Sequence, residues 1–156
     1  MRDINKKGLT RFGLLIIIVL LIVVICGLLV YFQNQKKRNF ITMAKEYVSN
    51  VRMLATEDKI MLPDTYKERV VISVKSLEKN PNRKSPFNAK WVTNKSYVVI
   101  KNAGTEYNPK YEYFIALQDE NGNCVELTKE SKLNRNLVSK KCTIDEVSET
   151  DAAYLE

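Results

Sequence analysis

Side chains able to carry out covalent or acid–base chemistry are few in this sequence. None of the 156 residues is a histidine, which excludes Cys-His and Ser-His-Asp catalysis and histidine-ligated zinc. Without histidine, the three cysteines do not provide the ligands of a metal site. The sequence contains no glycine-rich phosphate loop. The candidate carboxylates form no recognisable acid–base constellation; they are Asp64, Glu68, Glu112, Asp119 and Glu120. We therefore expect no enzymatic activity, catalytic residue, metal, cofactor or small-molecule substrate.

Basic residues alternate with aromatic ones in the middle of the chain. Such a pattern can bind an anionic polymer such as DNA or a cell-wall chain, because lysine and arginine contact phosphates and aromatic side chains stack on bases. The alternative, which we favour, is that these lysines are solvated and protect strand edges from aggregation. The residues of this possible patch are Lys75, Lys79, Arg83, Lys84, Lys90, Lys95 and Lys101, with Phe87, Trp91 and Tyr97.

The positive charge of the chain is concentrated in one part of it. Lysine and arginine number 25 against 18 acidic residues, for a net charge of +7. Residues 36–110 contain 16 basic and 7 acidic residues, whereas residues 111–156 contain 5 and 10. This asymmetry favours head-to-tail attraction between subunits or a basic face for anionic polymers, although an ordinary solvated surface remains possible.

The elements that must position these residues begin with an uncharged apolar segment, residues 12–32. Roughly 20 apolar residues in a helix match the ~30 Å hydrocarbon core of a bilayer, and a helix satisfies its own backbone polar groups there. We therefore predict one membrane-spanning helix, preceded by a basic cytosolic segment, residues 1–11. Cys26 lies in the middle of the span and is interpreted as a small apolar side chain.

Two other interpretations of this segment fit less well. A cleaved secretory signal would have a shorter apolar core and a small-x-small cleavage site, whereas Tyr31, Phe32 and polar residues follow here. A lipoprotein signal would place the lipid on Cys26, but the bulky Ile25 precedes it. Basic residues on both sides of the segment nearly balance. The brevity of the leading segment, together with the pair of cysteines in the distal domain, therefore favours a cytoplasmic N-terminus and an extracytoplasmic C-terminal domain.

Helical periodicity continues beyond the membrane segment. Between Gly27 and Pro63 there is neither glycine nor proline. Apolar residues recur at a period of about 3.6 and form one stripe (Phe40, Ala44, Tyr47, Val48, Val51, Leu54 and Ala55). We predict an amphipathic continuation of the helix over residues 33–62, ended by Pro63.

After Pro63 the hydrophobic period changes to two, which predicts strands. The expected strands are 69–77, 96–101, 111–118 and 124–128, with a hairpin turn at 119–123 around Asn121-Gly122. Phe87 and Trp91 are expected to anchor the long loop 78–94, and residues 129–141 are expected to be a short helix or an ordered loop. The fold class is therefore α+β, with a long N-terminal helix covering a small antiparallel meander, residues 63–144, followed by an acidic tail, residues 145–156.

The segment around Gly8 resembles the start of a type IV prepilin or type II secretion pseudopilin. Lys6, Lys7, Gly8, Leu9 and Thr10 precede the apolar helix in the order typical of that family. The layout of helix and meander is similar throughout the chain, and Lys84–Asn88 resembles a short segment that precedes the pseudopilin sheet. The resemblance implies cleavage by a prepilin peptidase after Gly8 and methylation of Leu9.

Two positions depart from the family pattern. The fifth residue after the cleavage site is usually glutamate and is Gly13 here, and the third is usually apolar and is Arg11 here. In the family that glutamate is thought to pair with a neighbour's N-terminal amine, since a buried charge needs a partner. A minor subunit therefore fits better than a major one.

The resemblance also implies a C-terminal disulfide between Cys124 and Cys142. Closing a loop of this size would stabilise the fold by ~3 kcal/mol and would require an oxidising, extracytoplasmic compartment. Two unpaired buried thiols remain the alternative.

Together these observations predict a structural subunit of a type IV pilus or type II secretion-like pseudopilus, whose apolar helix packs against other pilin-like subunits. The second hypothesis is a single-pass, signal-anchored extracytoplasmic domain that binds an anionic polymer, DNA or a partner protein.

Overall fold

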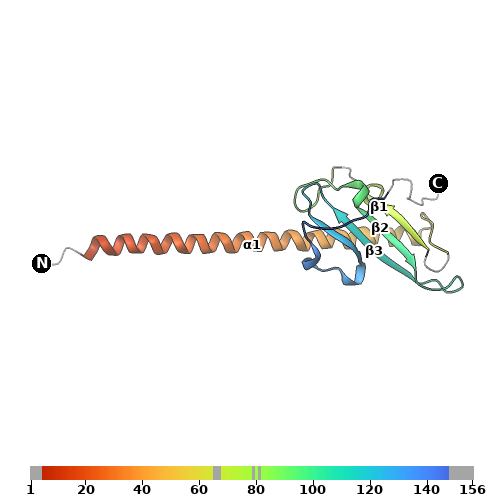
Figure 1. Cartoon of the computed structure of the whole chain (residues 1–156), viewed down its shortest axis with the longest axis horizontal. Coiled ribbons are helices and arrows are strands. Elements are labelled where there is room, and N and C mark those ends of the chain that lie inside the picture. The colour runs from red at the N-terminus through yellow and green to blue at the C-terminus, as the bar shows by residue number, and fades with distance from the viewer. Residues whose placement is uncertain (1–4, 65–67, 79, 81, 148–156) are drawn as a thin grey trace. The chain divides into compact units, whose positions relative to one another are not determined.

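The computed structural model describes residues 5–64, 68–78, 80 and 82–147, with side chains described from residue 13 onward. The chain divides into two compact units, one up to Gln35 and one from Lys36 onward. Helix α1, Asn5–Thr56, contributes to both units and is assigned as helix without interruption (Figure 1). Each unit is described by itself below.

The second unit contains a four-stranded antiparallel sheet in which sequential strands are neighbours. Its strands are β1, Arg69–Ser73, β2, Tyr97–Asn102, β3, Tyr111–Gln118, and β4, Cys124–Lys129, in the order β1-β2-β3-β4. The registers place Val71 opposite Val99 and Val99 opposite Phe114, and a bulge interrupts the β3–β4 pairing between Ile115 and Leu117. The sheet is therefore a meander, as predicted.

One face of this sheet packs on the part of α1 that belongs to the same unit. The predicted apolar stripe is buried, with Phe40, Tyr47 and Val51 all at 0% exposure, apart from the half-buried Leu54. It forms one core with the inward-facing strand residues (Ile72, Val98, Ile100, Ile115, Leu117 and Val125). The chain thus has the predicted α+β, pilin-like architecture, in which the helix supplies the apolar cover that a four-stranded sheet needs.

Helix α1 ends at Thr56, six residues before the predicted end at Leu62. Asp58 adopts a left-handed conformation with φ of 54°. Its N–H donates to the carbonyl of Ala55 at 3.4 Å, and the N–H of Lys59 donates to the carbonyl of Leu54 at 3.0 Å. These two bonds form a Schellman motif, which satisfies the last helical carbonyls. The prediction relied on Pro63 and missed a cap made by aspartate in place of glycine.

The first predicted strand is also too long at its C-terminal end. Strand β1 stops at Ser73, and a short helix α2, Val74–Leu77, follows. The Ser73 hydroxyl accepts a hydrogen bond from the N–H of Lys75 at 3.3 Å, and the hydroxyl of Ser76 donates to the carbonyl of Ser73 at 2.6 Å. Serine is a favoured helix N-cap, and here it overrides the strand propensity of Val74.

The remaining segments agree with the predicted layout in outline. Residues 129–141 are an ordered loop containing the 3₁₀ turns Glu130–Lys132 and Arg135–Leu137, whose neighbours Leu133 and Val138 are buried. Gly122 has the positive φ, 79°, that the β3–β4 turn was expected to need. Of the predicted acidic tail, only residues 145–147 lie within the described residues.

Candidate functional site

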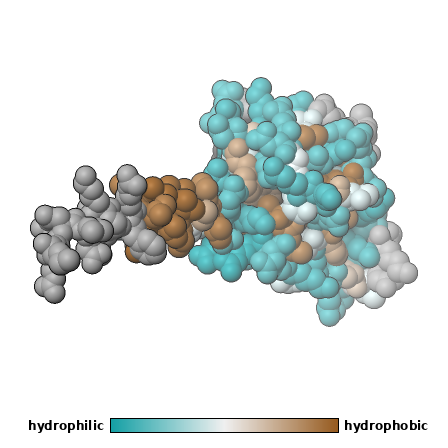
Figure 2. All heavy atoms as spheres, turned by 60° about the vertical axis from the view of Figure 1, so that its left-hand side comes forward, coloured by the Kyte–Doolittle hydropathy of each residue, from teal (hydrophilic) through white to brown (hydrophobic). Residues whose placement is uncertain are grey.

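The most extensive feature of the first unit is its uncovered apolar surface. Every leucine, isoleucine, valine and aromatic side chain from Leu14 to Phe32 is between 43% and 62% exposed. Figure 2 shows the corresponding brown surface, in contrast to the mostly hydrophilic second unit. Among the described residues, this is the one helix that is long and apolar enough to cross a membrane, judged by length and composition. A surface of this size needs lipid or other apolar helices around it, because soluble proteins rarely expose large apolar patches.

The residues implied in prepilin processing lie at the start of the same helix. Gly8 and Leu9 belong to α1 by their backbone, and the Leu9 side chain lies outside the described part of the chain. At Gly13, where the family usually has glutamate, an added Cβ would meet no atom within 4 Å. The missing carboxylate is therefore not excluded by crowding within this chain.

Aromatic and basic residues mark the end of the apolar segment. The Tyr31 and Phe32 rings meet edge to face with centroids 5.9 Å apart, and the amide of Gln35 donates to the Tyr31 hydroxyl at 3.0 Å. Lys36, Lys37 and Arg38 follow in the sequence. Tyrosine followed by basic residues is typical of the membrane–water interface.

A disulfide connects Cys124, at the start of β4, to Cys142, as the resemblance implied. The Cα atoms are 6.1 Å apart, within the usual range. The bond holds the segment 142–147 over the outer sheet face, where Ile144 joins a second apolar cluster with Tyr97 and Ala116. Because disulfides persist in oxidising compartments, this bond suggests that the second unit is extracytoplasmic.

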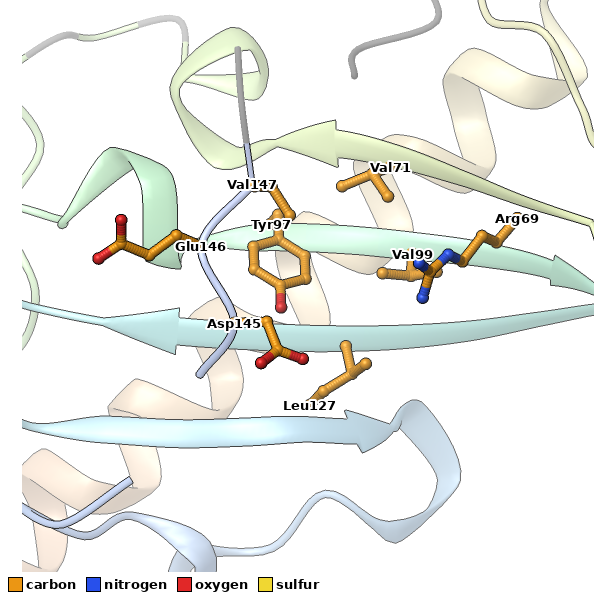
Figure 3. Close-up of a pocket in the computed structure, with 8 residues that line it drawn as sticks. All are labelled: Arg69, Val71, Tyr97, Val99, Leu127, Asp145, Glu146 and Val147. Atoms are coloured by element: carbon orange, nitrogen blue, oxygen red, sulfur yellow. The ribbon is translucent and has the colours of Figure 1, made fainter. Parts of the chain in front are cut away.

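The segment 142–147 forms one wall of a hollow on the outer sheet face, about 350 Å³ in volume. Figure 3 shows Val71, Tyr97 and Val99 on its floor, with Asp145 and Glu146 on the crossing segment. Burial, together with the nearby Asp145 carboxylate, raises the pKa of the Tyr97 phenol. The floor of the hollow is thus largely apolar, and two carboxylates border it.

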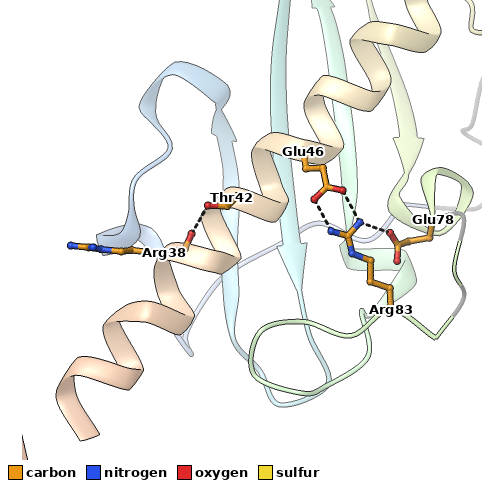
Figure 4. Close-up of polar contacts among 5 residues, drawn as sticks. All are labelled: Arg38, Thr42, Glu46, Glu78 and Arg83. Atoms are coloured by element: carbon orange, nitrogen blue, oxygen red, sulfur yellow. Dashed lines mark hydrogen bonds and ion pairs between the residues drawn. The ribbon is translucent and has the colours of Figure 1, made fainter. Parts of the chain in front are cut away.

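Arg83 connects the loop after α2 to helix α1. Its guanidinium donates to both carboxylate oxygens of Glu46, at 2.8 and 2.6 Å, and to Glu78 at 3.5 Å (Figure 4). The Glu78 side chain is only 9% exposed, and the Arg83 guanidinium also lies 5.8 Å from the centroid of the Tyr47 ring. A bidentate arginine–carboxylate pair of this kind fixes the relative orientation of the two side chains in addition to pairing their charges.

The electrostatics of this cluster follow from its contacts. Hydrogen bonding to Arg83 lowers the pKa of Glu46, and the same bond raises the pKa of Arg83. Burial, with the neighbouring Glu78 carboxylate, raises the pKa of the Tyr47 phenol, which therefore stays protonated. Arg83 and Glu46 are consequently both charged at neutral pH and form an ion pair.

The predicted anionic-polymer patch is only partly brought together. One cleft of about 210 Å³ is lined by four of its members, Lys75, Arg83, Lys90 and Trp91. Two others lie outside this lining: Lys95 approaches Glu146 at 3.4 Å, and Lys84 is exposed. Trp91 packs edge to face on Phe40, with ring centroids 5.2 Å apart, and on Tyr47 at 6.1 Å. Lys79 lies outside the described residues. Arg83 is thus engaged by carboxylates, and Trp91 is largely an anchor of the core.

The segment Lys84–Asn88, singled out by the resemblance, connects α1 to the β3–β4 turn. Ser85 donates from its hydroxyl to the carboxylate of the fully buried Asp119 at 2.6 Å, and the amide of Asn123 donates to the same carboxylate at 3.1 Å. Phe87 packs on Phe40 with ring centroids 6.0 Å apart. Asp119 is therefore a structural carboxylate whose hydrogen bonds offset its burial. Sequence reasoning placed it only among the candidate acids.

A scan against protein-family models found no matching family, and searches of curated proteins and of solved structures found no match. The likeness to pilins consequently rests on the architecture described above.

Proposed function

We propose that this protein is a structural subunit, of the minor kind, in a type IV pilus or type II secretion-like pseudopilus. The apolar surface of residues 14–32 carries the proposal, because every large apolar side chain in that segment is exposed. In the membrane lipid covers this surface, and in a filament the helices of neighbouring subunits do. The protein performs no covalent chemistry of its own.

The self-contained second unit supports this role. Among the described residues, its core of helix stripe and sheet uses none before Phe40, so the apolar segment can move from lipid to filament without unfolding the domain. The disulfide keeps the C-terminal segment on the sheet in an oxidising compartment. The N-terminus is cytoplasmic, the segment 12–32 spans the membrane once, and the second unit lies outside.

Processing of the N-terminus tests the proposal. Mass spectrometry of the membrane-extracted protein, in cells with an active prepilin peptidase, is expected to find a mature chain beginning at methylated Leu9. Gly8→Val should abolish cleavage, whereas the control Gly13→Ala should leave it intact, since its Cβ meets nothing within 4 Å. A chain that still begins at Met1 in these cells would contradict the proposal.

A signal-anchored domain that binds anionic polymers is the second candidate. It is supported by the cleft that brings Lys75, Lys90 and Trp91 together. The engagement of Arg83 by Glu46 and Glu78 weakens it. The full chain in detergent should bind DNA at low salt and release it as salt rises if this candidate is correct, and binding should be absent at any salt if it is not.

A further inference from the structure

The loop between β2 and β3 exposes an aromatic side chain almost completely. Tyr107 is 95% exposed, the highest value among the large hydrophobic side chains described outside α1. Figure 1 shows β2 and β3 leading into this loop at the right of the view. A tyrosine with few neighbours gains nothing for the fold, but it offers a large contact area that loses little rotamer freedom on binding.

The backbone of this loop is held firmly. The fully buried Asn102 side chain accepts from the N–H of Gly104 at 2.9 Å and donates to the carbonyl of Asp64 at 3.2 Å. Thr105 and Asn108 exchange two backbone hydrogen bonds, of 3.1 and 3.2 Å, around Glu106 and Tyr107. A Cβ at Gly104 would collide with the carbonyl of Asn108, so close chain packing requires glycine there. The loop backbone that carries Tyr107 is therefore preorganised.

A cleft of suitable size lies at the other end of β2. It measures about 210 Å³ and is lined by Val74, Trp91 and Thr93 among others. A cavity of about 150 Å³ accommodates benzene, so one tyrosine ring fits, whereas ordinary small-molecule pockets are larger, about 300–1,000 Å³. The exposed Lys90 at its edge is positive, and Glu106 next to Tyr107 is negative.

The two features lie at opposite ends of the same strand. Ser96 borders the cleft just before β2 begins, and Asn102 holds the loop where β2 ends. Six strand residues at ~3.3 Å each separate them by roughly 20 Å. A loop at one end and a matching cleft at the other cannot meet within one chain, but they can join successive copies in a head-to-tail series.

We propose that Tyr107 of one copy inserts into the Val74–Trp91–Thr93 cleft of a second copy of this chain, with Glu106 facing Lys90. This contact rests on the proposed filament function, and it requires that two copies of this minor subunit lie next to each other in the filament. It assigns the second units a specific head-to-tail contact in addition to the packing of the apolar helices. Ring burial against Trp91 gives the contact its affinity, and the charge pair sets its orientation.

Site-directed cross-linking of the full chain tests the contact. In a Cys26→Ser background, Asn108→Cys, which keeps the Tyr107 ring, is combined with Thr93→Cys and treated with a short bifunctional maleimide in cells that assemble the filament. The expected result is a ladder of dimers and higher multimers, since every copy carries both ends. Either single variant alone, and Thr93→Cys with the exposed control Lys140→Cys, should give none.

A second measurement separates the ring from the fold. Tyr107→Ala should raise the dissociation constant between two copies of the chain about thirtyfold, as expected for the loss of an aromatic anchor. Tyr107→Phe should retain most of the affinity. Fluorescence of Trp91, the single tryptophan, should shift on association of the wild type and not of the alanine variant.

Three outcomes would overturn the contact. The first is an absent ladder. The second is cross-linking of two copies through the thiols introduced by Asn108→Cys in both, and the third is cross-linking of that thiol to a different protein. The amount of protein in sheared filaments, measured in the same cells, reports separately on the proposed function. Filaments without the ladder would contradict this contact alone.

Discussion

Two stretches of helix α1 have the same secondary structure and opposite environments. Phe32 is 58% exposed, and Phe40, eight residues later, is 0% exposed. The first stretch is apolar on all sides, whereas the second is apolar only on the stripe that the sheet covers. A helix that is apolar all round needs an apolar surrounding, and an amphipathic one needs a protein core. The difference teaches that one helix can leave an apolar surface uncovered along its first stretch and form part of a protein core along its second.

Alanine at the two phenylalanines gives the largest expected contrast. Phe40→Ala should destabilise the second unit by about 3–5 kcal/mol, since it removes a fully buried ring from the core. Phe32→Ala should leave the unfolding free energy of that unit unchanged within about 0.5 kcal/mol. Denaturant unfolding followed by Trp91 fluorescence measures both variants. Equal effects would mean that the two stretches do not differ as described.

Removing the disulfide should affect only the second unit. Cys124→Ser with Cys142→Ser opens a loop with a sequence separation of 18 residues. The expected loss of stability is about 3 kcal/mol, from the greater entropy of the unfolded chain. Membrane retention, measured by carbonate extraction, should not change, because the apolar segment does not depend on this bond. Release of the variant from membranes would show that the two units are not independent.

Two arginine–glutamate pairs, one bidentate and one with a single contact, sharpen the account of how α1 is held. Arg83 bonds Glu46 and Arg52 bonds Glu130, each at 2.6 Å, and each guanidinium lies near a tyrosine ring. Arg83→Gln should cost about 1–3 kcal/mol, since it leaves the buried Glu78 carboxylate without its partner. Arg52→Gln, at an exposed pair, should cost about 0–1 kcal/mol. Thermal unfolding of the two variants measures the difference, and a larger loss at Arg52 would refute this ranking.

Lowering the pH should weaken the ion pair between Glu46 and Arg83, and this is the smallest of the predicted effects. The folded-state pKa of Glu46 is lowered from its ordinary value of 4.5, so its stabilising effect is present above that pH and is lost as pH falls through the lowered value. Glu46→Gln should therefore reduce the acid sensitivity of Trp91 fluorescence below pH 4.5. Glu112, whose pKa is also lowered, by Lys129, provides the control as Glu112→Gln, because it lies away from Trp91 on β3. A Trp91 transition unchanged in Glu46→Gln would remove Glu46 from this role.

The fold was predictable wherever periodicity was strong. The stripe from Phe40 to Ala55 and the alternation in Tyr111–Gln118 fix which residues face each other, and both are confirmed. The errors are at ends of elements, where one side chain decides. Asp58 caps α1 without glycine, and Ser73 starts a helix within an apolar segment, so neither follows from a hydrophobic pattern.

The candidate site was less predictable, because partners distant in sequence determine what a side chain can do. Arg83 was assigned to a basic patch, and the carboxylate that binds it lies 37 residues earlier. Trp91 was assigned both to that patch and to the core, and its contacts with Phe40 and Tyr47 favour the core. No sequence pattern indicates that Tyr107 is exposed, since its exposure depends on how Asn102 and Gly104 shape the loop.

The composition of sheared surface filaments tests the central claim most directly, namely that residues 14–32 exchange lipid for neighbouring helices. Filaments sheared from cells that have an active prepilin peptidase should contain this chain with its N-terminus at Leu9. Replacing Leu21 and Val24 with arginine should remove the chain from both membrane and filaments, since each charge at the centre of a span costs about 2.5–3.5 kcal/mol. Intact filaments that lack the wild-type chain, while it remains in the membrane beginning at Met1, would contradict the account.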